Sequence, residues 1–454
     1  MKTFEIEITN LGPIRSATFS ASHFNLICGK NNSGKSMCLH SVFCFLSKWR
    51  SKIHLSAGGE LAEEVVQKTR VKFDALQFVE RLNPALASSS DEFSKHLYEF
   101  LNKSQEQLND CKVVFQMNPA YIRDRLQHSN VNVFLSITPT SKLVLRKEFN
   151  TTESVFIVEN SGGGEFPEKG LVAAAINRLI DYLLVEMVLP RPYLMTAERS
   201  GSILYGDDLR TKSFLDQVSQ PKKVVEAGAV SARYAYPYVQ ELKDFWDAQS
   251  NPVAAPSDLE KVMMPSDNVS ESFGENVALG TYKEHDGKIY YQPQGDAREF
   301  RLSEVSTSVR ALMQLDHFVK RSYRERNLLL MMDEPELNLH PERQRALARF
   351  LVLLMRMRGV GVAISTHSDY LVKEINTLLM FGSGDASTAA IMQRYGYQES
   401  EVLRTEDVAC GVAEDQTIKT YEPSKEDGFA LPNFDTTIEL MNEIQDAIRW
   451  EDKA

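Results

Sequence analysis

A glycine-rich octapeptide near the N-terminus has the residue types that bind phosphate. Residues 29–36 read GKNNSGKS, in which two glycines five positions apart precede a lysine and a hydroxyl residue. Backbone N–H groups of such a loop surround nucleotide phosphates, the lysine neutralises the β- and γ-phosphates, and the hydroxyl ligates Mg²⁺. A glycine-rich turn without a ligand is the alternative, which the apolar strand pattern before the loop and the helical pattern after it disfavour. The residues expected to contact phosphate are Gly29, Asn31, Asn32, Ser33, Gly34, Lys35 and Ser36.

A pair of carboxylates lies far along the chain from this loop. Residues 328–332 read LLLMM, a pattern typical of a buried strand, and lead directly into Asp333 and Glu334. We expect the strand to place Asp333 where it holds Mg²⁺, directly or through water, with the hydroxyl of Ser36 as a second metal ligand. Glu334 would polarise the attacking water as the catalytic carboxylate. Two solvated turn residues are the alternative, which the phosphate-binding loop disfavours.

The absence of a guanine-binding motif indicates which nucleotide base is bound. An Asn-Lys-x-Asp segment would recognise guanine, and the nearest string, NKSQ at residues 102–105, lacks the acid. ATP is therefore the expected nucleotide and ATP hydrolysis the expected reaction.

Short strands and helices must position these residues. Residues 3–19 form two alternating runs broken at Leu11-Gly12-Pro13, which predicts a β-hairpin, and a third apolar run leads into the phosphate-binding loop. A second hairpin is predicted over 282–290. After residue 327, a strand, a helix over 341–357 and a strand over 360–366 follow one another, which predicts a largely parallel α/β sheet.

The segment between the two motifs has a different pattern. Helical spacing is found before Pro84, over 91–109 and again from Leu171, and strand-like runs cover 131–137, 142–149 and 154–158. Because about three hundred residues are too many for a compact domain between these motifs, the middle is expected to be an insertion. No long heptad run is found, so a coiled-coil arm is not expected.

Composition restricts the location and the partners. The 454 residues carry 62 acidic and 51 basic side chains, and the net charge of −11 disfavours non-specific nucleic-acid binding but leaves room for a local basic groove. The five cysteines have no zinc-ligand spacing, and the N-terminus has no signal-peptide pattern. Residues 171–190 are apolar but contain three charged residues, which predicts a buried helix and not a membrane span. A cytoplasmic protein with no membrane partner is expected.

Two strings in the C-terminal half carry a family resemblance. DEPELNLHPERQ at residues 333–344, followed by ISTHS at 364–368, resembles the ABC-type ATPase heads of the SMC and OLD families, most closely the AAA-like ATPases of prokaryotic anti-phage systems. The resemblance implies that His367 senses the γ-phosphate, as a catalytic residue beside Glu334, and that residues 337–340 lie at a dimer interface. A structural histidine after a strand is the alternative for His367.

The resemblance extends more weakly to residues 302–308 and 193–201. Residues 302–308 occupy the place of the signature loop, which implies that Ser306 or Ser308 contacts the nucleotide of the opposite subunit; the usual glycine is absent, so which serine does so stays open. The alternative is a Ser/Thr N-cap for a helix over 309–320. In the second string, Arg199 either contacts nucleotide or, as we favour, pairs with Glu198 or another carboxylate.

Together these features predict an α/β fold: an ABC/SMC-type P-loop ATPase head with a mixed α/β insertion. The expected segments are the head with the phosphate-binding loop at 1–49, the insertion at 50–281, the second part of the head at 282–382 and a C-terminal α/β extension at 383–454. Two copies, or a larger oligomer, would sandwich ATP and Mg²⁺ between them.

The resemblance also implies a biological role. The expected function is that of an ATP-binding and ATP-hydrolysing sensor or assembly subunit of an anti-phage system of the PARIS or Septu type. A separately encoded effector, expected to be a nuclease, and a phage-derived trigger would be its partners, whereas nucleic acid is not required. Fewer than a hundred residues follow His367 and contain no Asp-x-Asp, so no toprim nuclease is expected in this chain.

Two other classes of protein are the alternatives. One is an SMC-like DNA-binding ATPase of repair or chromosome maintenance, which the absence of coiled-coil arms disfavours. The other is a nucleotide-dependent scaffold without catalysis, which the presence of Lys35, Asp333 and Glu334 disfavours.

Overall fold

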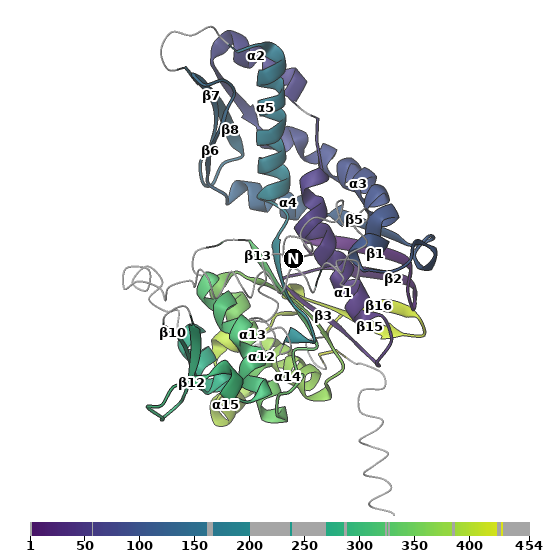
Figure 1. The fold of residues 1–454 in the computed structure, drawn as a ribbon, viewed down its shortest axis with the longest axis vertical. Coiled ribbons are helices and arrows are strands. Elements are labelled where there is room, and N and C mark those ends of the chain that lie inside the picture. The colour runs from purple at the N-terminus through teal and green to yellow at the C-terminus, as the bar shows by residue number, and fades with distance from the viewer. Residues whose placement is uncertain are drawn as a thin grey trace, which may run out of the picture.

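A nine-stranded mixed sheet forms the centre of the protein in the computed structural model (Figure 1). The structure describes residues 2–56, 58–160, 167–199, 237, 269–285, 288–322, 325, 327–383, 386–424 and 428–429. The strand order is β5-β1-β2-β16-β15-β3-β14-β13-β9. The strands of this sheet are β1 Phe4–Leu11, β2 Ile14–Ser20, β3 Phe24–Gly29, β5 Lys112–Met117, β9 Arg191–Met195, β13 Leu328–Asp333, β14 Gly361–Thr366, β15 Val408–Glu414 and β16 Thr417–Tyr421.

The middle of the sheet is parallel, as the alternation of strands and helices predicts. Strand β3 pairs in parallel with both β14 and β15, and β13 pairs in parallel with β14 and β9. The antiparallel pairs are β1–β2, β1–β5 and β15–β16. Every residue of β13 is buried, which explains its continuous apolar sequence, because the strands of a parallel sheet are covered on both faces. The α/β fold class is confirmed, with a sheet that is mixed at one end.

The two faces of the sheet pack into two hydrophobic cores. Leu329 and Met331 of β13 belong to the core that contains α1 and α3, whereas Leu330 and Met332 belong to the core that contains α12, α13 and α14. This division follows from the strand, whose successive side chains point to opposite faces. Figure 1 shows α1 and α3 on one side of the sheet and α12, α13 and α14 on the other. These helices are α1 Lys35–Cys44, α3 Val79–Phe100, α12 Thr307–Arg321, α13 Pro341–Arg358 and α14 Asp369–Met380.

A second, four-stranded sheet forms a separate lobe with α2 and α5 (Figure 1). Its strand order is β4-β8-β7-β6, and all its pairs are antiparallel. The strands predicted over 131–137, 142–149 and 154–158 are confirmed as β6, β7 and β8. The elements of this lobe and the helix next to it are α2 Gly58–Lys68, β4 Arg70–Asp74, α4 Pro119–Gln127, β6 Val131–Ser136, β7 Ser141–Lys147, β8 Glu153–Asn160 and α5 Lys169–Asp181.

The apolar stretch at 171–190 is a buried helix, as predicted. Helix α5 continues into a π-helical turn at Tyr182–Glu186, and the buried side chains of both pack into the first core. Among the described residues, no helix is both long enough and apolar enough to cross a membrane.

The predicted helix break at Pro84 is wrong, because α3 runs continuously through it from Val79 to Phe100. An internal proline costs about 3 kcal/mol of helix stability. The helix nevertheless keeps one buried face across the proline, with Leu82 and Leu86 on either side of it, and packing of an apolar face outweighs local propensity. The second predicted helix, over 91–109, is the C-terminal part of α3. It ends at Phe100, and β5 follows at Lys112.

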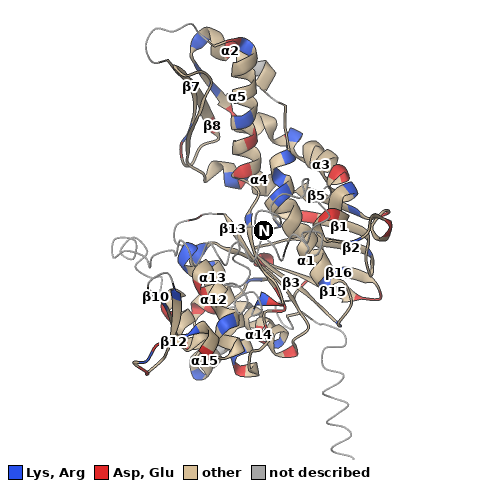
Figure 2. Ribbon diagram, viewed as in Figure 1, with Lys and Arg blue, Asp and Glu red and all other residues tan. Residues whose placement is uncertain are grey.

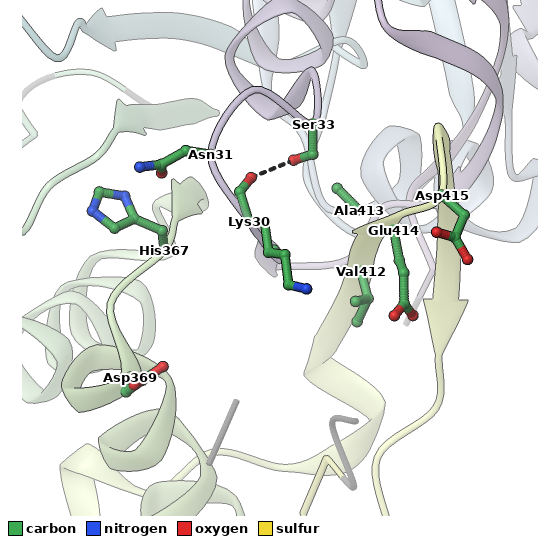
Figure 3. A pocket seen from close by; sticks show the side chains of 10 residues that line it. Lys30, Asn31, Ser33, His367, Asp369, Val412, Ala413, Glu414 and Asp415 are labelled. Carbon is green, nitrogen blue, oxygen red and sulfur yellow. Dashed lines mark hydrogen bonds between the residues drawn. The ribbon is translucent and has the colours of Figure 1, made fainter. Parts of the chain in front are cut away.

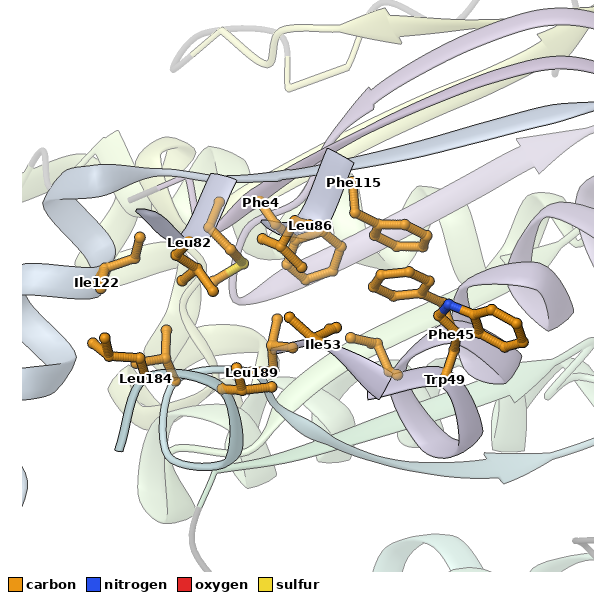
Figure 4. Packing of buried hydrophobic residues seen from close by; sticks show 14 of the residues in the cluster. Phe4, Phe45, Trp49, Ile53, Leu82, Leu86, Phe115, Ile122, Leu184 and Leu189 are labelled. Carbon is orange, nitrogen blue, oxygen red and sulfur yellow. The ribbon is translucent and has the colours of Figure 1, made fainter. Parts of the chain in front are cut away.

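Strand β5, which the sequence pattern did not reveal, is attached through aromatic packing. Phe115 of β5 stacks on Phe45, with ring centroids 3.8 Å apart (Figure 4). Phe45 also contacts Phe93 edge-on. These rings join the end of α1, the helix α3 and the edge of the sheet.

The central sheet takes strands from all four predicted segments. Strands β5 and β9 come from 50–281 and pair with β1 and β13, and β15 and β16 come from 383–454 and lie between β3 and β2. The division into domains at residues 49, 281 and 382 remains a prediction.

The C-terminal segment also packs against α13, where basic residues gather in Figure 2. Arg349 of α13 forms a 2.8 Å ion pair with Glu401, and Arg345 forms a 2.7 Å ion pair with Glu374 of α14. The hairpin predicted over 282–290 is confirmed by β10 and β11, although its turn at 286–287 lies outside the described residues. The remaining elements are β10 Gly280–His285, β11 Lys288–Pro293, β12 Phe300–Arg301, α11 Val269–Ser272 and α15 Ala386–Tyr395.

Candidate functional site

The glycine-rich loop connects β3 to α1 at the carboxyl end of the parallel strands. Gly34 caps α1 with φ of +91°, and a Cβ there would lie 2.5 Å from Cγ1 of Ile14. A Cβ on Gly29, whose φ is +141°, would lie 2.4 Å from the carbonyl oxygen of Ala413. Both positions therefore require glycine. Since Gly34 has no side chain to cap α1, the first N–H groups of the helix offer an anion-binding end.

Lys35 lies buried inside this loop. Its Nζ donates to the carbonyl oxygens of Gly29 at 2.9 Å and Lys30 at 2.7 Å. Burial lowers the pKa of Lys35, and the nearby negative charges of Glu334 and Asp333 oppose that shift. An anionic phosphate beside Lys35 would favour the charged amine further.

Asp333 ends strand β13 and contacts Ser36 of the glycine-rich loop. The Ser36 hydroxyl donates to Asp333 Oδ1 at 2.9 Å, and the Ser365 hydroxyl donates to the same oxygen. His40 Nε2 of α1 lies 3.4 Å from Asp333 Oδ2. Burial opposes ionisation of Asp333, but the contacts from His40, Ser365 and Ser36 together hold its pKa below the ordinary value. The structure thus brings together the two residues predicted to ligate the metal, with the carboxylate in its charged form.

Glu334 and His367 lie next to each other at the ends of β13 and β14. The backbone N–H of Glu334 donates to the carbonyl oxygen of Ser365 at 2.9 Å, which joins the two strand ends. His367 Nδ1 lies 3.6 Å from Glu334 Oε1, and both side chains are partly exposed. The predicted catalytic pair is therefore adjacent and accessible to a substrate.

A cavity of about 390 Å³ opens beside the glycine-rich loop (Figure 3). The first half of the loop forms its roof, His367 and Asp369 lie on one side, and the turn between β15 and β16 lies on the other. Among the described residues, its lining is Gly29, Lys30, Asn31, Ser33, His367, Asp369, Val412, Ala413, Glu414 and Asp415. Four lining residues were not predicted, because only the pairing of β15 with β3 brings them to the loop: Val412, Ala413 and Glu414 at the end of β15, and Asp415 in the turn after it.

Arg199 binds the backbone of the turn that follows β13. Its buried guanidinium donates to the carbonyl oxygens of Asp333 and Glu334 at 3.3 Å and of Pro335 at 3.0 Å. Glu334 has a positive φ of 47°, a conformation that needs such support in a residue with a side chain. The contacts found for Arg199 thus stabilise the carboxylate turn, whereas the sequence favoured a carboxylate partner.

The two signature-loop serines occupy the start of α12. Ser306 is its N-cap and accepts from the N–H of Val309 at 3.4 Å, and the hydroxyls of Ser306 and Ser308 lie 2.8 Å apart. Neither serine lines the cavity beside the glycine-rich loop. The helix-cap alternative therefore matches the observed contacts of Ser306, and the contact with a second subunit's nucleotide remains a prediction.

Around the two carboxylates, three further residues were missed from the sequence. His40 contacts Asp333, Ser365 donates to the same carboxylate, and Glu336 accepts from the backbone N–H of His367. Ser365 and Glu336 lie within two positions of His367 and Glu334, so their closeness in the sequence could have suggested them. His40 had no comparable signal, since a histidine on a helix is usually a packing residue.

Comparison with known proteins finds a similarity to one family model over part of the chain. A family model described as AAA ATPase domain matches residues 235–372, which contain Glu334, His367 and both serines. No curated protein matches this chain. The family match supports ATPase activity, at the level of the family.

Solved structures of SMC heads match over nearly the whole chain with low TM-scores. The SMC head domain with an extended coiled coil bound to the C-terminal domain of ScpA, from Pyrococcus furiosus, is 11% identical, covers 98% of this chain and 99% of its own, and has a TM-score of 0.36. An SMC head bound to the C-winged helix domain of ScpA is 12% identical, covers 92% and 97%, and has a TM-score of 0.36. The SMC head domain from Thermotoga maritima is 10% identical, covers 93% and 100%, and has a TM-score of 0.32.

Proposed function

We propose that this chain binds ATP in the glycine-rich loop and hydrolyses it. The contact between Ser36 and Asp333, which are 297 residues apart in the sequence, carries the proposal. It joins the glycine-rich loop after β3 to the acidic end of β13, two strands away in the sheet, as ATP hydrolysis with a divalent cation requires. The AAA ATPase match over 235–372 supports the same reaction.

Ser36 and Asp333 fit the requirements of Mg²⁺. They offer a hydroxyl and a charged carboxylate as oxygen ligands, which this hard cation prefers, and they leave positions for water and phosphate oxygens. Bound there, Mg²⁺ would neutralise phosphate charge. Among the described residues, no cluster of three His, Cys, Asp or Glu side chains offers a different metal site.

Each remaining residue has a role in binding or in proton transfer. The loop N–H groups and Lys35 bind the phosphates, which neutralises their charge in the ground state and in the transition state. Glu334 orients the attacking water and accepts its proton. We assign to His367, whose Nδ1 lies 3.6 Å from Glu334 Oε1, the role of donating a hydrogen bond to a γ-phosphate oxygen.

Substitutions of Lys35 and Glu334 test these roles separately. We expect Lys35→Ala to abolish ATP binding, and Glu334→Gln to keep binding but lower phosphate release by about a hundredfold or more, as expected for loss of a general base. Calorimetric ATP titration and a phosphate-release assay measure the two effects. Lys72→Ala and Glu374→Gln, which remove an exposed lysine of β4 and a buried carboxylate remote from the loop, are matched controls. Equal hydrolysis by Glu334→Gln and the unmodified chain would remove Glu334 from the mechanism.

We further propose an ATP-sandwiched dimer that serves as the sensor of an anti-phage system. One support is the resemblance of residues 333–344 and 364–368 to such ATPases. The other is the start of α12, where a helix N-terminus and the hydroxyls of Ser306 and Ser308 do not line the cavity of their own chain. ATP binding would stabilise a conformation whose surface binds a separately encoded effector. A phage-derived trigger would shift the equilibrium between this conformation and a second one. Such a shift requires a difference of a few kcal/mol in binding free energy between the two states.

Co-expression with the adjacent gene tests the partner. We expect a stable complex, and we expect the purified chain with ATP and Mg²⁺ to cut neither DNA nor RNA. Metal-dependent cleavage by this chain alone, lost on substitution of its own carboxylates outside the ATP site, would contradict the proposal. Tight ATP-dependent DNA binding without an effector would favour the SMC-like alternative.

A further inference from the structure

Glu336 is a buried carboxylate directly behind His367. It lies in the turn between β13 and α13, and only 5% of it is exposed. Its Oε1 accepts from the Thr366 hydroxyl at 2.6 Å and from the backbone N–H of His367 at 3.0 Å. Because both donors share one buried oxygen, these two contacts restrain the end of β14.

The restraint extends along residues 366–368. The Thr366 hydroxyl that donates to Glu336 also accepts from the backbone N–H of Ser368 at 3.0 Å. The Ser368 hydroxyl in turn caps α14 by accepting from the N–H of Leu371 at 3.2 Å. Glu336 is therefore the first acceptor in a series of hydrogen bonds that fixes the backbone on both sides of His367.

The imidazole itself is held less tightly than its backbone. His367 Nδ1 lies 3.4 Å from Glu336 Oε1 and 3.6 Å from Glu334 Oε1, distances longer than those of good hydrogen bonds. The ring is 37% exposed, so a nucleotide could approach it. Glu336 thus sets the position from which the ring extends, while the ring keeps its freedom to bind a substrate.

The environment of Glu336 differs from that of a carboxylate that only stabilises the fold. Glu374 is equally buried, but its two oxygens are bound by Arg345 at 2.7 Å and by the Tyr397 hydroxyl at 2.8 Å. No hydrogen-bond partner is found for Glu336 Oε2 among the described residues. A buried carboxylate with an unsatisfied oxygen reduces stability, which indicates that the position serves something other than stability.

We propose that Glu336 is a positioning residue for the ATPase reaction, which acts by fixing the backbone of His367 so that the imidazole faces Glu334. The inference rests on the proposed function, because it assigns His367 a part in hydrolysis. It also links the turn that carries Glu334 to the residue at the end of the neighbouring strand.

Variants of Glu336 and Thr366 test the link from both of its ends. We expect Glu336→Ala to lower kcat about ten- to a hundredfold, since a misplacement of about 1 Å has effects of that size, and to change KM and ATP affinity less than about twofold. Glu336→Gln keeps a carbonyl acceptor and should restore most of kcat. Thr366→Val removes the hydroxyl contact without removing the carboxylate and should also lower kcat. Glu374→Gln, the matched buried carboxylate, should lower thermal stability and leave kcat unchanged.

A double-mutant cycle with His367→Ala separates positioning from a general structural effect. If Glu336 acts through His367, Glu336→Ala should cause no further loss of kcat in the His367→Ala background. Independent, multiplicative losses would overturn the proposal, as would an unchanged kcat in both Glu336→Ala and Thr366→Val.

A spectroscopic measurement keeps the inference distinct from the proposed function. The His367 ring signal in a ¹³C–¹H spectrum, assigned by its loss in His367→Ala, should shift in Glu336→Ala and Thr366→Val but not in Glu374→Gln. A shift without ATP hydrolysis by the unmodified chain would contradict the proposed function and support the placement of His367 by Glu336. An unshifted signal would overturn the inference even if the chain hydrolyses ATP.

Discussion

Three side chains from two elements contact Asp333. Ser36 and His40 come from α1, and Ser365 comes from β14. The two hydroxyls share Oδ1, whereas His40 approaches Oδ2, so the orientation of the carboxylate depends on contacts at both oxygens. A residue next to a metal ligand affects metal affinity when it controls the direction of the ligand.

At the residue scale we expect His40→Leu to raise the Mg²⁺ concentration needed for half-maximal ATP hydrolysis. Loss of an outer contact to a metal ligand lowers metal affinity by about ten- to a hundredfold. Mg²⁺ titrations of the ATPase rate at fixed ATP measure this shift. His128→Leu, which replaces an exposed histidine at the end of α4, is the control. The same Mg²⁺ midpoint in His40→Leu and the unmodified chain would show that Asp333 needs no support from His40.

At the scale of elements, α12 contains a partly buried titratable residue, His317. Burial, with smaller contributions from Arg321 and Lys320, lowers the pKa of His317 to about 4. In the unfolded chain a histidine has a pKa of about 6.5. Between these two values the unfolded state binds more protons than the folded state, so the stability contributed by neutral His317 is lost as the pH falls.

We therefore expect the free energy of unfolding to decrease between pH 6.5 and pH 4 more steeply in the unmodified chain than in His317→Gln. The slope contributed by one such group is at most about 1.4 kcal/mol per pH unit, and partial exposure reduces it. Urea unfolding at several pH values measures the two slopes, and His128→Gln controls for an exposed histidine. Parallel slopes for His317→Gln and the unmodified chain would show that His317 titrates alike in both states.

Element boundaries depended on packing as much as on local pattern. Helix α3 passes through Pro84 because its buried face is continuous, and β5 forms because Phe115 stacks on Phe45. In contrast, the β1–β2 hairpin and β13 were predicted correctly, because their patterns are local and strong.

At the scale of the whole molecule, the start of α12 allows a test of whether two copies of the chain share one ATP site. Ser306 and Ser308 do not line the cavity beside the glycine-rich loop, so a role for them in hydrolysis requires a second copy of the chain. We expect mixtures of inactive Lys35→Ala chains and inactive Ser306→Arg chains to regain part of the activity, because one composite site per mixed dimer is intact.

Phosphate release from such mixtures, at a range of protein concentrations, measures the effect. Thr377→Arg, which introduces an arginine at a partly exposed position of α14, is the control. Activity that is independent of concentration in a strictly monomeric sample would contradict a shared site.

The sequence by itself determined the parts of the site whose residues are contiguous. Residues 29–36 connect β3 to α1 and include the start of that helix, Asp333 ends β13 with Glu334 directly after it, and His367 follows β14. Their types and order are the basis of the proposed chemistry, because a glycine-rich loop and an acidic strand end are local structures.

Only the tertiary structure decided which distant residues complete the site. His40 reaches Asp333 because α1 packs against β13 and β14, and the β15–β16 turn reaches the loop because β15 pairs with β3. Arg199 and Glu336 bind backbone groups, which have the same chemistry at every residue, so the sequence does not show which residues they contact. Contacts between segments far apart in the chain depend on how whole strands and helices pack, which no local spacing records.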